Sequence, residues 1–219
     1  MPEEAFFAVL NNDARDALEC SGRRRQFGAG QVLFSEGDDG HDVIVLLAGA
    51  VKIVTTSASG REVILDVMED NELLGELSAI DGEPRSATAV ALTPVDVLVI
   101  PAEPFHDFLE GHGAAATELL RLVARRLRRS SQRQLEFGTS DALSRICACV
   151  LRMLDSKQQQ GNPEVTMLLA QHELASLTGL SREAVVKGLR ALRQLGWIDL
   201  QGRTLHVLDE EALRQRAAT

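Results

Sequence analysis

Short apolar runs separated by turn residues fill residues 26–101, and this pattern restricts the fold more than any other feature of the chain. Residues 43–47, 51–54 and 63–67 are rich in β-branched side chains and have the length of strands. Glycine, proline or paired polar residues stand between the runs. Regular spacing of this kind predicts an antiparallel β-sandwich or barrel of the jelly-roll type.

Helical patterns precede and follow the β-rich region. In residues 3–20, Phe6, Phe7 and Leu10 recur at helical spacing, and Asp13 is a candidate cap for a second short turn. Residues 101–113 contain a short helix around Phe105. Both segments have the amphipathic pattern of packing helices, with no chemistry of their own.

The longest helical pattern covers residues 114–137, which contain no glycine or proline. Leu120, Leu127, Ser131 and Gln134 lie with Val123 or Ala124 on one stripe, close to the ~3.5-residue repeat of a coiled coil. We therefore predict that this helix forms the seam of a parallel homodimer. The stripe becomes polar at Ser130-Ser131, and a register-setting polar step is one explanation.

A hinge is predicted at residues 137–141, Phe-Gly-Thr-Ser-Asp, where a glycine would end the long helix and capping residues would begin the next. A supporting helix over residues 142–156 and a polar loop at 157–163 follow. The predicted fold is α+β with three parts: a β-roll domain (1–113), a dimerisation helix (114–137) and a C-terminal domain (138–219).

The C-terminal part has the pattern of a helix-turn-helix. A first helix from about residue 171 ends at Gly179, Ser181 caps the next, and Val185 and Leu189 face inward. An ordinary packed helix pair is the alternative. Residues 197–200 and 204–208 form a hairpin, the wing of a winged helix, and residues 209–219 a short polar helix and tail.

Four residues project from the first turns of the second helix, where such helices meet base edges: Arg182, Glu183, Val186 and Lys187. Arginine reads guanine bidentately, glutamate accepts from the cytosine amino group, and lysine reaches a guanine or a phosphate. Arg203, at the tip of the hairpin, is a candidate phosphate contact. The predicted interface with double-stranded DNA is completed by Gln171, Thr178 and Ser181.

A polar segment between two strand-like runs has the groups that bind one phosphate and one sugar. Arg85 can present a forked guanidinium to a phosphate, and Ser86 adds a hydroxyl and a backbone N–H. Gly75 permits close approach of the main chain, and residues 77–80 can form a helical turn whose amides favour an anion. Glu76 is suited to a ribose hydroxyl if a cation balances its charge. A surface turn with a solvated Arg–Glu pair is the alternative.

The formal net charge is −9, which is unusual for a protein that binds nucleic acid. Residues 1–137 hold 13 Lys and Arg against 23 Asp and Glu, whereas residues 138–219 hold 10 against 9. Affinity for DNA depends on the local surface, and an acidic front domain discourages indiscriminate binding. The acidic total therefore does not exclude a DNA-binding module in the second half.

Other functional classes find little support. No apolar run approaches the ~20 residues of a membrane helix, and the first residues lack the features of a signal peptide, so we expect a cytoplasmic protein. The three cysteines and five histidines form no metal-ligand motif. No acid–base pair or activated nucleophile can be assembled from the motifs, so we expect that the protein is not an enzyme and binds no metal.

The two motifs resemble one family. Gly-Glu-Leu at 75–77, followed by Arg-Ser-Ala at 85–87, is similar to the phosphate-binding cassette of cyclic-nucleotide-binding domains. Ser-Arg-Glu-x-Val-x-Lys at 181–187 resembles the recognition helix of the same family. Nearly the whole chain resembles bacterial transcription regulators of the cyclic AMP receptor protein and fumarate-nitrate reductase regulator family, in the cyclic AMP receptor branch.

The resemblance implies a role for each part of the nucleotide site. Arg85 and Ser86 would hold the cyclic phosphate with help from the backbone at Ala87, while Gly75 and Glu76 would take the ribose 2′-hydroxyl. The remaining members of the implied site are Leu77 in the cassette, Arg126 as the cation that balances Glu76, Ser130 for adenine in its own subunit, and Ser131 for adenine across the dimer.

The resemblance also implies the function: a homodimeric transcription regulator that binds cyclic AMP as an allosteric ligand and then a palindromic DNA site. The loop at 157–163 would lie where RNA polymerase is met. Two departures from the family pattern concern selectivity, because Ser130 replaces the usual threonine and Lys187 the usual arginine. The alternative is a DNA-binding regulator of the same fold that is ligand-independent or responds to another nucleotide such as cyclic GMP.

Overall fold

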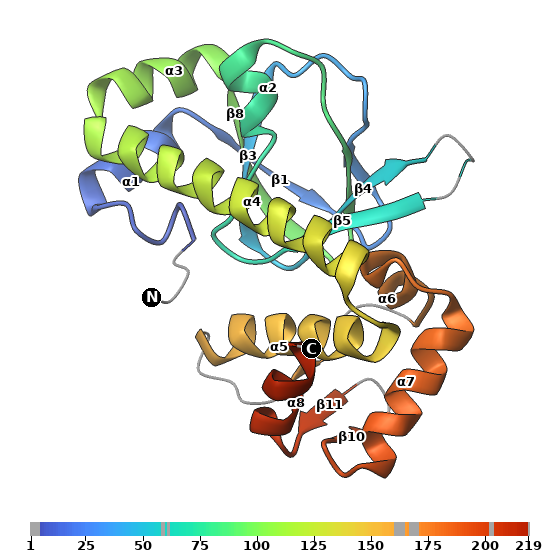
Figure 1. Cartoon of the computed structure of the whole chain (residues 1–219). Helices are drawn as coiled ribbons and strands as arrows, with labels where there is room; N and C mark the ends of the chain where they lie inside the picture. Colours follow the sequence, from blue (N-terminus) through green and yellow to red (C-terminus); the bar gives the residue numbers. More distant parts are fainter. Residues whose placement is uncertain are drawn as a thin grey trace. The chain divides into compact units, whose positions relative to one another are not determined.

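The computed structural model describes residues 5–57, 60, 62–159, 165–166, 171–201 and 204–218. By its internal contacts the chain divides into two compact units, one that ends at Leu127 and one that begins at Arg128. Figure 1 shows both units, which we describe separately.

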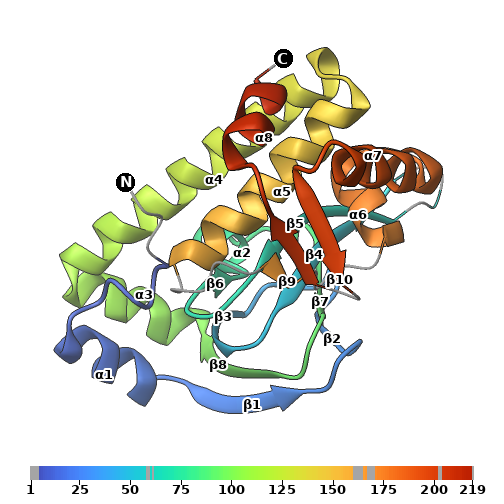
Figure 2. The same ribbon diagram turned by 90° about the horizontal axis from the view of Figure 1, so that it is seen from below.

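The first unit contains two four-stranded sheets, in which every strand pairing is antiparallel. One sheet has the order β1 (Arg23–Phe27), β8 (Val95–Pro101), β3 (Asp42–Ala48) and β6 (Leu73–Leu74). The other has the order β2 (Val32–Phe34), β7 (Thr88–Ala91), β4 (Val51–Thr56) and β5 (Glu62–Met68). Strand β1 lies at the margin of its sheet, next to β8 (Figure 2). The predicted antiparallel β-roll is confirmed.

Strand β3 explains why this β-roll needs both sheets and helices. Its side chains alternate between two cores, because successive residues of a strand point to opposite faces. Ile44 and Leu46 belong to the core that contains residues of both sheets. Val43 and Val45 belong to a second core, which the helices share. A strand buried on both faces has an almost continuous apolar sequence, as residues 43–47 do.

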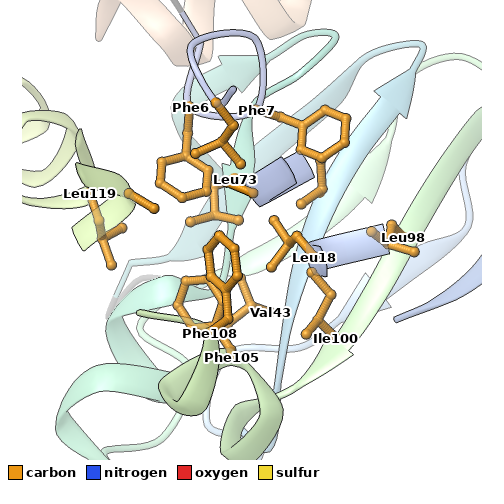
Figure 3. Packing of buried hydrophobic residues seen from close by; sticks show 14 of the residues in the cluster. Phe6, Phe7, Leu18, Val43, Leu73, Leu98, Ile100, Phe105, Phe108 and Leu119 are labelled. Carbon is orange, nitrogen blue, oxygen red and sulfur yellow. The ribbon is translucent and has the colours of Figure 1, made fainter. Parts of the chain in front are cut away.

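Helices α1 (Asn12–Cys20), α3 (Ala102–Gly111) and the start of α4 (Gly113–Thr139) supply that second core. Figure 3 shows Phe105 and Phe108 beside Val43, with Leu119 of α4 nearby. The predicted helix over residues 3–20 is wrong in its first part, because residues 6–9 form turns that bury Phe6 and Phe7. The cap of α1 is Asn11, not Asp13: the Asn11 side chain accepts from the Ala14 amide at 2.8 Å.

The long helix α4 runs from Gly113 to Thr139, so Gly138 does not end it as predicted. The break falls at Ser140 and Asp141, where the Asp141 carboxylate accepts from the Ser144 amide at 2.9 Å and begins the next helix. This capping bond fixes the boundary, because glycine only weakens a helix interior whereas a cap defines its first turn. On the predicted seam, Leu120 and Leu127 are 71% and 67% exposed.

The second unit contains α5 (Ala142–Gln159), α6 (Gln171–Thr178), α7 (Arg182–Gln194) and α8 (Glu210–Ala217). Its three-stranded sheet has the order β10 (Ile198–Gln201), β11 (Thr204–Val207) and β9 (Val165–Thr166), which confirms the predicted hairpin. Residues 157–159 belong to α5 instead of the predicted loop, and residues 160–163 lie outside the described part of the chain. None of the described helices has the length and apolar composition that a membrane crossing requires.

Candidate nucleotide site and DNA interface

Gly75 introduces the cassette helix α2 (Glu76–Asp81), and the structure gives two reasons for a glycine here. Its φ of 74° lies in the left-handed region that side chains disfavour. A Cβ at this position would also collide with the guanidinium of Arg85. The backbone carbonyl of Gly75 accepts from Arg85 Nη1 at 2.7 Å. The absence of a side chain at Gly75 therefore allows the Arg85 guanidinium to reach the backbone carbonyl of this residue.

Arg85 is 4% exposed, so the alternative of a solvated surface turn is wrong. Besides Gly75, its guanidinium donates to the Asp42 carbonyl at 2.8 Å and to the Asp42 carboxylate. It also stacks on Phe34, with Cζ 4.4 Å from the ring centroid. Sequence reasoning missed Asp42, because no local pattern shows that the first residue of β3 faces a turn more than 40 positions later.

Glu76 is 2% exposed and pairs with Arg126 of α4, as the family resemblance implied. Arg126 Nη1 donates to Glu76 Oε1 at 2.6 Å, and Nη2 donates to the Leu73 carbonyl at 2.6 Å. Burial opposes the charge of Arg126, but the carboxylates of Glu76, Glu72 and Asp66 outweigh it and raise the pKa of the guanidinium. The carboxylate in the cassette thus has its balancing cation in place.

One donor at this site has no acceptor. Arg85 Nε is buried and makes no hydrogen bond within the described structure. The next residue, Ser86, is exposed, whereas Ala87, just before β7, is buried. A buried charged donor without a partner is costly, and an anionic oxygen is the natural acceptor for it. These residues therefore fit a phosphate group.

The remaining predicted nucleotide contacts are solvent-accessible. Leu77 projects from α2 and is exposed, and Ser130 and Ser131 are exposed on α4. The two serines belong to the unit that begins at Arg128, and the cassette belongs to the other. Their role in adenine recognition stays a prediction.

In the second unit the helix-turn-helix has the predicted landmarks. Gly179 ends α6 with a φ of 64°, and the Ser181 hydroxyl caps α7 by accepting from the Ala184 amide at 3.1 Å. Val185 and Leu189 are buried, as predicted. Sequence reasoning overlooked Gly188, where a Cβ would collide with Ile146 of α5. An isolated glycine inside a helix was the available signal of such close packing.

The predicted DNA contacts divide by exposure. Arg182, Glu183 and Lys187 are exposed on α7, Val186 is partly exposed beside them, and Gln171 is exposed at the start of α6. Thr178 is different: it is buried and its hydroxyl donates to the Leu174 carbonyl at 2.7 Å. Because the hydroxyl is already used in a hydrogen bond within α6, we remove Thr178 from the proposed DNA contacts. Arg203 lies outside the described residues.

A buried ionic site suited to a phosphate, on a β-roll followed by a long helix and a winged helix-turn-helix, defines a class of ligand-responsive DNA-binding regulators. Two family models match in that order: a cyclic nucleotide-binding domain at residues 24–112 and a Crp-like helix-turn-helix domain at residues 144–216.

Curated relatives are similar over almost the whole chain. The CRP-like cAMP-activated global transcriptional regulator of Mycobacterium tuberculosis is 33% identical over 193 residues, 87% of this chain and 86% of the relative. The cyclic AMP receptor protein of Thermus thermophilus is 31% identical over 195 residues, 89% of this chain and 88% of the relative. The structure of FixK2 from Bradyrhizobium japonicum shares the fold, with a TM-score of 0.81, 18% identity, and coverage of 90% of this chain and 98% of that one.

The chain belongs to the CRP/FNR family of bacterial transcription regulators. It is accordingly a DNA-binding regulator with a cyclic-nucleotide-binding domain, and its relatives are regulators, not enzymes.

Proposed function

We propose that the protein is a homodimeric transcription regulator of the cyclic AMP receptor branch, which binds cyclic AMP and then a palindromic DNA site in the cytoplasm. The cassette of Gly75, Glu76, Arg85, Ser86 and Ala87 takes the cyclic phosphate and the ribose. Ser130 and Ser131 recognise adenine. Two relatives that are similar over most of the chain, one named as a cAMP-activated global transcriptional regulator and one as a cyclic AMP receptor protein, support this choice of ligand.

The observation that carries the proposal is the buried guanidinium of Arg85, which Gly75 and Asp42 hold in place beside the exposed Ser86 and whose Nε can still donate. A cyclic phosphate supplies an acceptor for Nε, and it shares the guanidinium with the Asp42 carboxylate, which already pairs with Arg85. Glu76 already has Arg126 as counter-charge, so it can accept from a ribose hydroxyl without repelling the phosphate strongly. The phosphate thus meets the Arg85 guanidinium, and the ribose meets the Glu76 carboxylate, whose charge Arg126 balances.

Dimerisation is proposed through α4. Leu120 and Leu127 stand seven residues apart on this helix, and both are largely exposed in the single chain. Exposed leucines at heptad spacing are the ordinary seam of a parallel coiled coil. In a dimer the two α7 helices would enter successive major grooves about 34 Å apart, one turn of DNA.

The proposed mechanism is a shift of population. Ligand that binds one arrangement of the dimer more tightly raises its share, and the hinge at Ser140–Asp141 re-aims α7. Arg182, Glu183 and Lys187 then reach base edges and phosphates together in both half-sites. Contact with RNA polymerase at residues 157–163 is proposed from the family resemblance alone.

Calorimetric titration tests whether the protein binds cyclic AMP in preference to cyclic GMP. Cyclic AMP and cyclic GMP are titrated into the purified wild-type protein and into Ser130→Ala and Arg182→Ala variants. We expect wild type to bind cyclic AMP more tightly than cyclic GMP, Ser130→Ala to reduce that preference, and Arg182→Ala, the matched control in the DNA module, to leave both affinities unchanged. Equal affinities for the two nucleotides would contradict cyclic AMP selectivity.

A second function, regulation without a nucleotide, is favoured by one contact. The Asp42 carboxylate already binds Arg85 and supplies a negative charge close to the place proposed for a phosphate. A regulator locked by this internal pair would select its DNA site equally with and without cyclic nucleotide. Site selection from a random DNA pool, with and without cyclic AMP, distinguishes the two functions.

A further inference from the structure

The junction between α4 and α5 is held by a residue from the far end of the chain. Asp141 caps α5 through its Oδ1, which accepts from the Ser144 amide. Its Oδ2 accepts from Arg216 of α8, and Arg216 Nη1 also donates to the Ser144 hydroxyl at 2.5 Å. Arg216 therefore binds both the cap of α5 and a residue of its first turn.

Helix α8 is anchored on α5 independently of this contact. The two helices pack against each other, and Leu213 of α8 is fully buried. A second arginine, Arg214, pairs with Asp155 in the later part of α5 at 2.9 Å and with Glu210 of its own helix at 2.7 Å. These attachments hold α8 on α5 at positions away from the junction that Arg216 contacts. The arginine at 216 acts specifically at the junction.

The contacts of Arg216 are of unequal burial. Ser144 is 1% exposed, so its hydroxyl depends on a protein partner. The Asp141 side chain is 61% exposed, yet the hydrogen bonds from the Ser144 amide and Arg216 lower its pKa to about 2. The carboxylate is therefore charged at every physiological pH and holds the arginine at the start of α5.

The first turn of α5 also contacts the helix-turn-helix formed by α6 and α7. Arg145, next to Ser144, places Nη1 3.5 Å from the Thr178 carbonyl at the end of α6. Its Cζ also lies 5.8 Å from the centroid of Phe137, in the last turn of α4. A Cβ on Gly179, in the turn before α7, would lie 3.1 Å from the Phe137 ring. The end of α4, the start of α5 and the turn before α7 thus meet at one place.

We propose that Arg216 is a positioning residue that fixes the first turn of α5 at the α4–α5 junction and thereby transmits nucleotide binding to the recognition helix. In this role Arg216 acts through Asp141 and Ser144 and not by contact with nucleotide or DNA. By holding Asp141 and Ser144 it keeps Arg145 against the end of α6. A movement of α4 then also moves α7, whereas without this contact the junction could change conformation and leave α7 in place. The transmission part of this inference rests on the proposed response to cyclic AMP.

The first test measures coupling. The coupling ratio is the DNA affinity at saturating cyclic AMP divided by the affinity without it, measured by fluorescence anisotropy on a labelled site selected by wild type. Arg216→Gln should lower this ratio by about two- to thirtyfold, the range of mutations that modulate coupling. Arg214→Gln, which removes the ion pair between Arg214 of α8 and Asp155 of α5, should leave the ratio unchanged, and neither variant should alter cyclic AMP affinity by calorimetry.

Asp141→Asn refines the first test. Asparagine keeps the cap on α5 but loses the carboxylate that binds Arg216. It should lower the ratio in the same direction as Arg216→Gln, and by no more, because Arg216 keeps its bond to the Ser144 hydroxyl. The double variant should be no worse than Arg216→Gln alone, because that variant has already lost the contact with Asp141. An unchanged ratio in Arg216→Gln, or the same loss in Arg214→Gln, would overturn the inference.

The second test needs no ligand. Hydrogen exchange of the unliganded protein should show faster exchange in the first turns of α5 for Arg216→Gln and wild-type rates there for Arg214→Gln. Wild-type exchange in both variants would overturn the positioning role, whatever cyclic AMP does. If wild type itself has a coupling ratio of one while Arg216→Gln exchanges faster, then the proposed response to cyclic AMP fails, the transmission fails with it, and the positioning of α5 stands.

Discussion

The nucleotide site and the DNA interface use the same kinds of side chain in opposite surroundings. In the cassette unit, Glu76 and Arg85 are enclosed, and each is held by a partner of opposite charge. On α7, Arg182 and Glu183 project into solvent. An enclosed charge must be matched inside the protein, whereas an exposed one is matched by water until DNA arrives. Substitutions in the first region should therefore affect folding and binding together, and those in the second only binding.

The largest effect on stability is expected from Arg126→Met. It leaves the Glu76 carboxylate buried without its cation, and breaking a buried pair in this way costs about 3–5 kcal/mol. Urea unfolding followed by circular dichroism, at equal protomer concentrations, measures the loss. Arg121→Met is the control on the same helix, because it removes the exposed pair with Glu118 and should cost at most about 1 kcal/mol. Equal losses in both variants would show that the buried pair Arg126–Glu76 stabilises the fold no more than the exposed pair Arg121–Glu118 does.

Arg85→Leu should come next and should affect both properties. Loss of its bonds leaves the Gly75 and Asp42 carbonyls without a donor, a cost of about 1–3 kcal/mol in stability. Cyclic AMP affinity should fall at least about tenfold, because a hydrogen bond to a charged group contributes about 1.5–3 kcal/mol. Calorimetry at a temperature where the variant is folded measures the affinity. Normal affinity would disprove the cassette assignment.

Arg182→Ala should separate binding from folding. We expect relaxed preference at one base position, with a loss of about 1–3 kcal/mol for the selected site. Stability should change by no more than about 0.5 kcal/mol, since the side chain is exposed. Selection from a random DNA pool, together with thermal unfolding, measures both quantities. Unchanged base preference would remove Arg182 from the proposed contacts.

The smallest expected effect concerns pH. The pKa of Asp141 is lowered from an ordinary 3.8 to about 2, so its contribution to stability is full above about pH 4 and is lost as the pH falls toward 2. Because the side chain is largely exposed, that contribution is at most about 1 kcal/mol. The stability difference between wild type and Asp141→Asn should therefore shrink between pH 4 and pH 2. A difference that is independent of pH would contradict the assigned contact.

Periodicity and local motifs were sufficient to predict the β-roll, the long helix, the helix-turn-helix and the hairpin. The failures occurred where a stronger signal, either another local one or a tertiary one, overrides a local propensity. Gly138 is a helix breaker by propensity, yet α4 continues through it because the cap at Asp141 sets the boundary. Phe6 and Phe7 have helical spacing, but they are buried from turns.

The candidate sites show the same division. The resemblance identified Arg85, Glu76 and Arg126, and the structure brings the last two together. It gave no indication of Asp42 or Arg216, because each acts through a contact between residues far apart in the sequence. Thr178 was predicted from the sequence as a DNA contact, and only the structure reveals that its hydroxyl donates to the Leu174 carbonyl within α6.

The central claim, that the enclosed site controls the exposed one, is tested most directly by DNA binding as a function of cyclic AMP. Fluorescence anisotropy with a labelled selected site should show tighter binding by wild type as cyclic AMP is added, and no such change for Arg85→Leu at the same nucleotide concentrations. Identical DNA affinity of wild type with and without cyclic AMP would contradict the account.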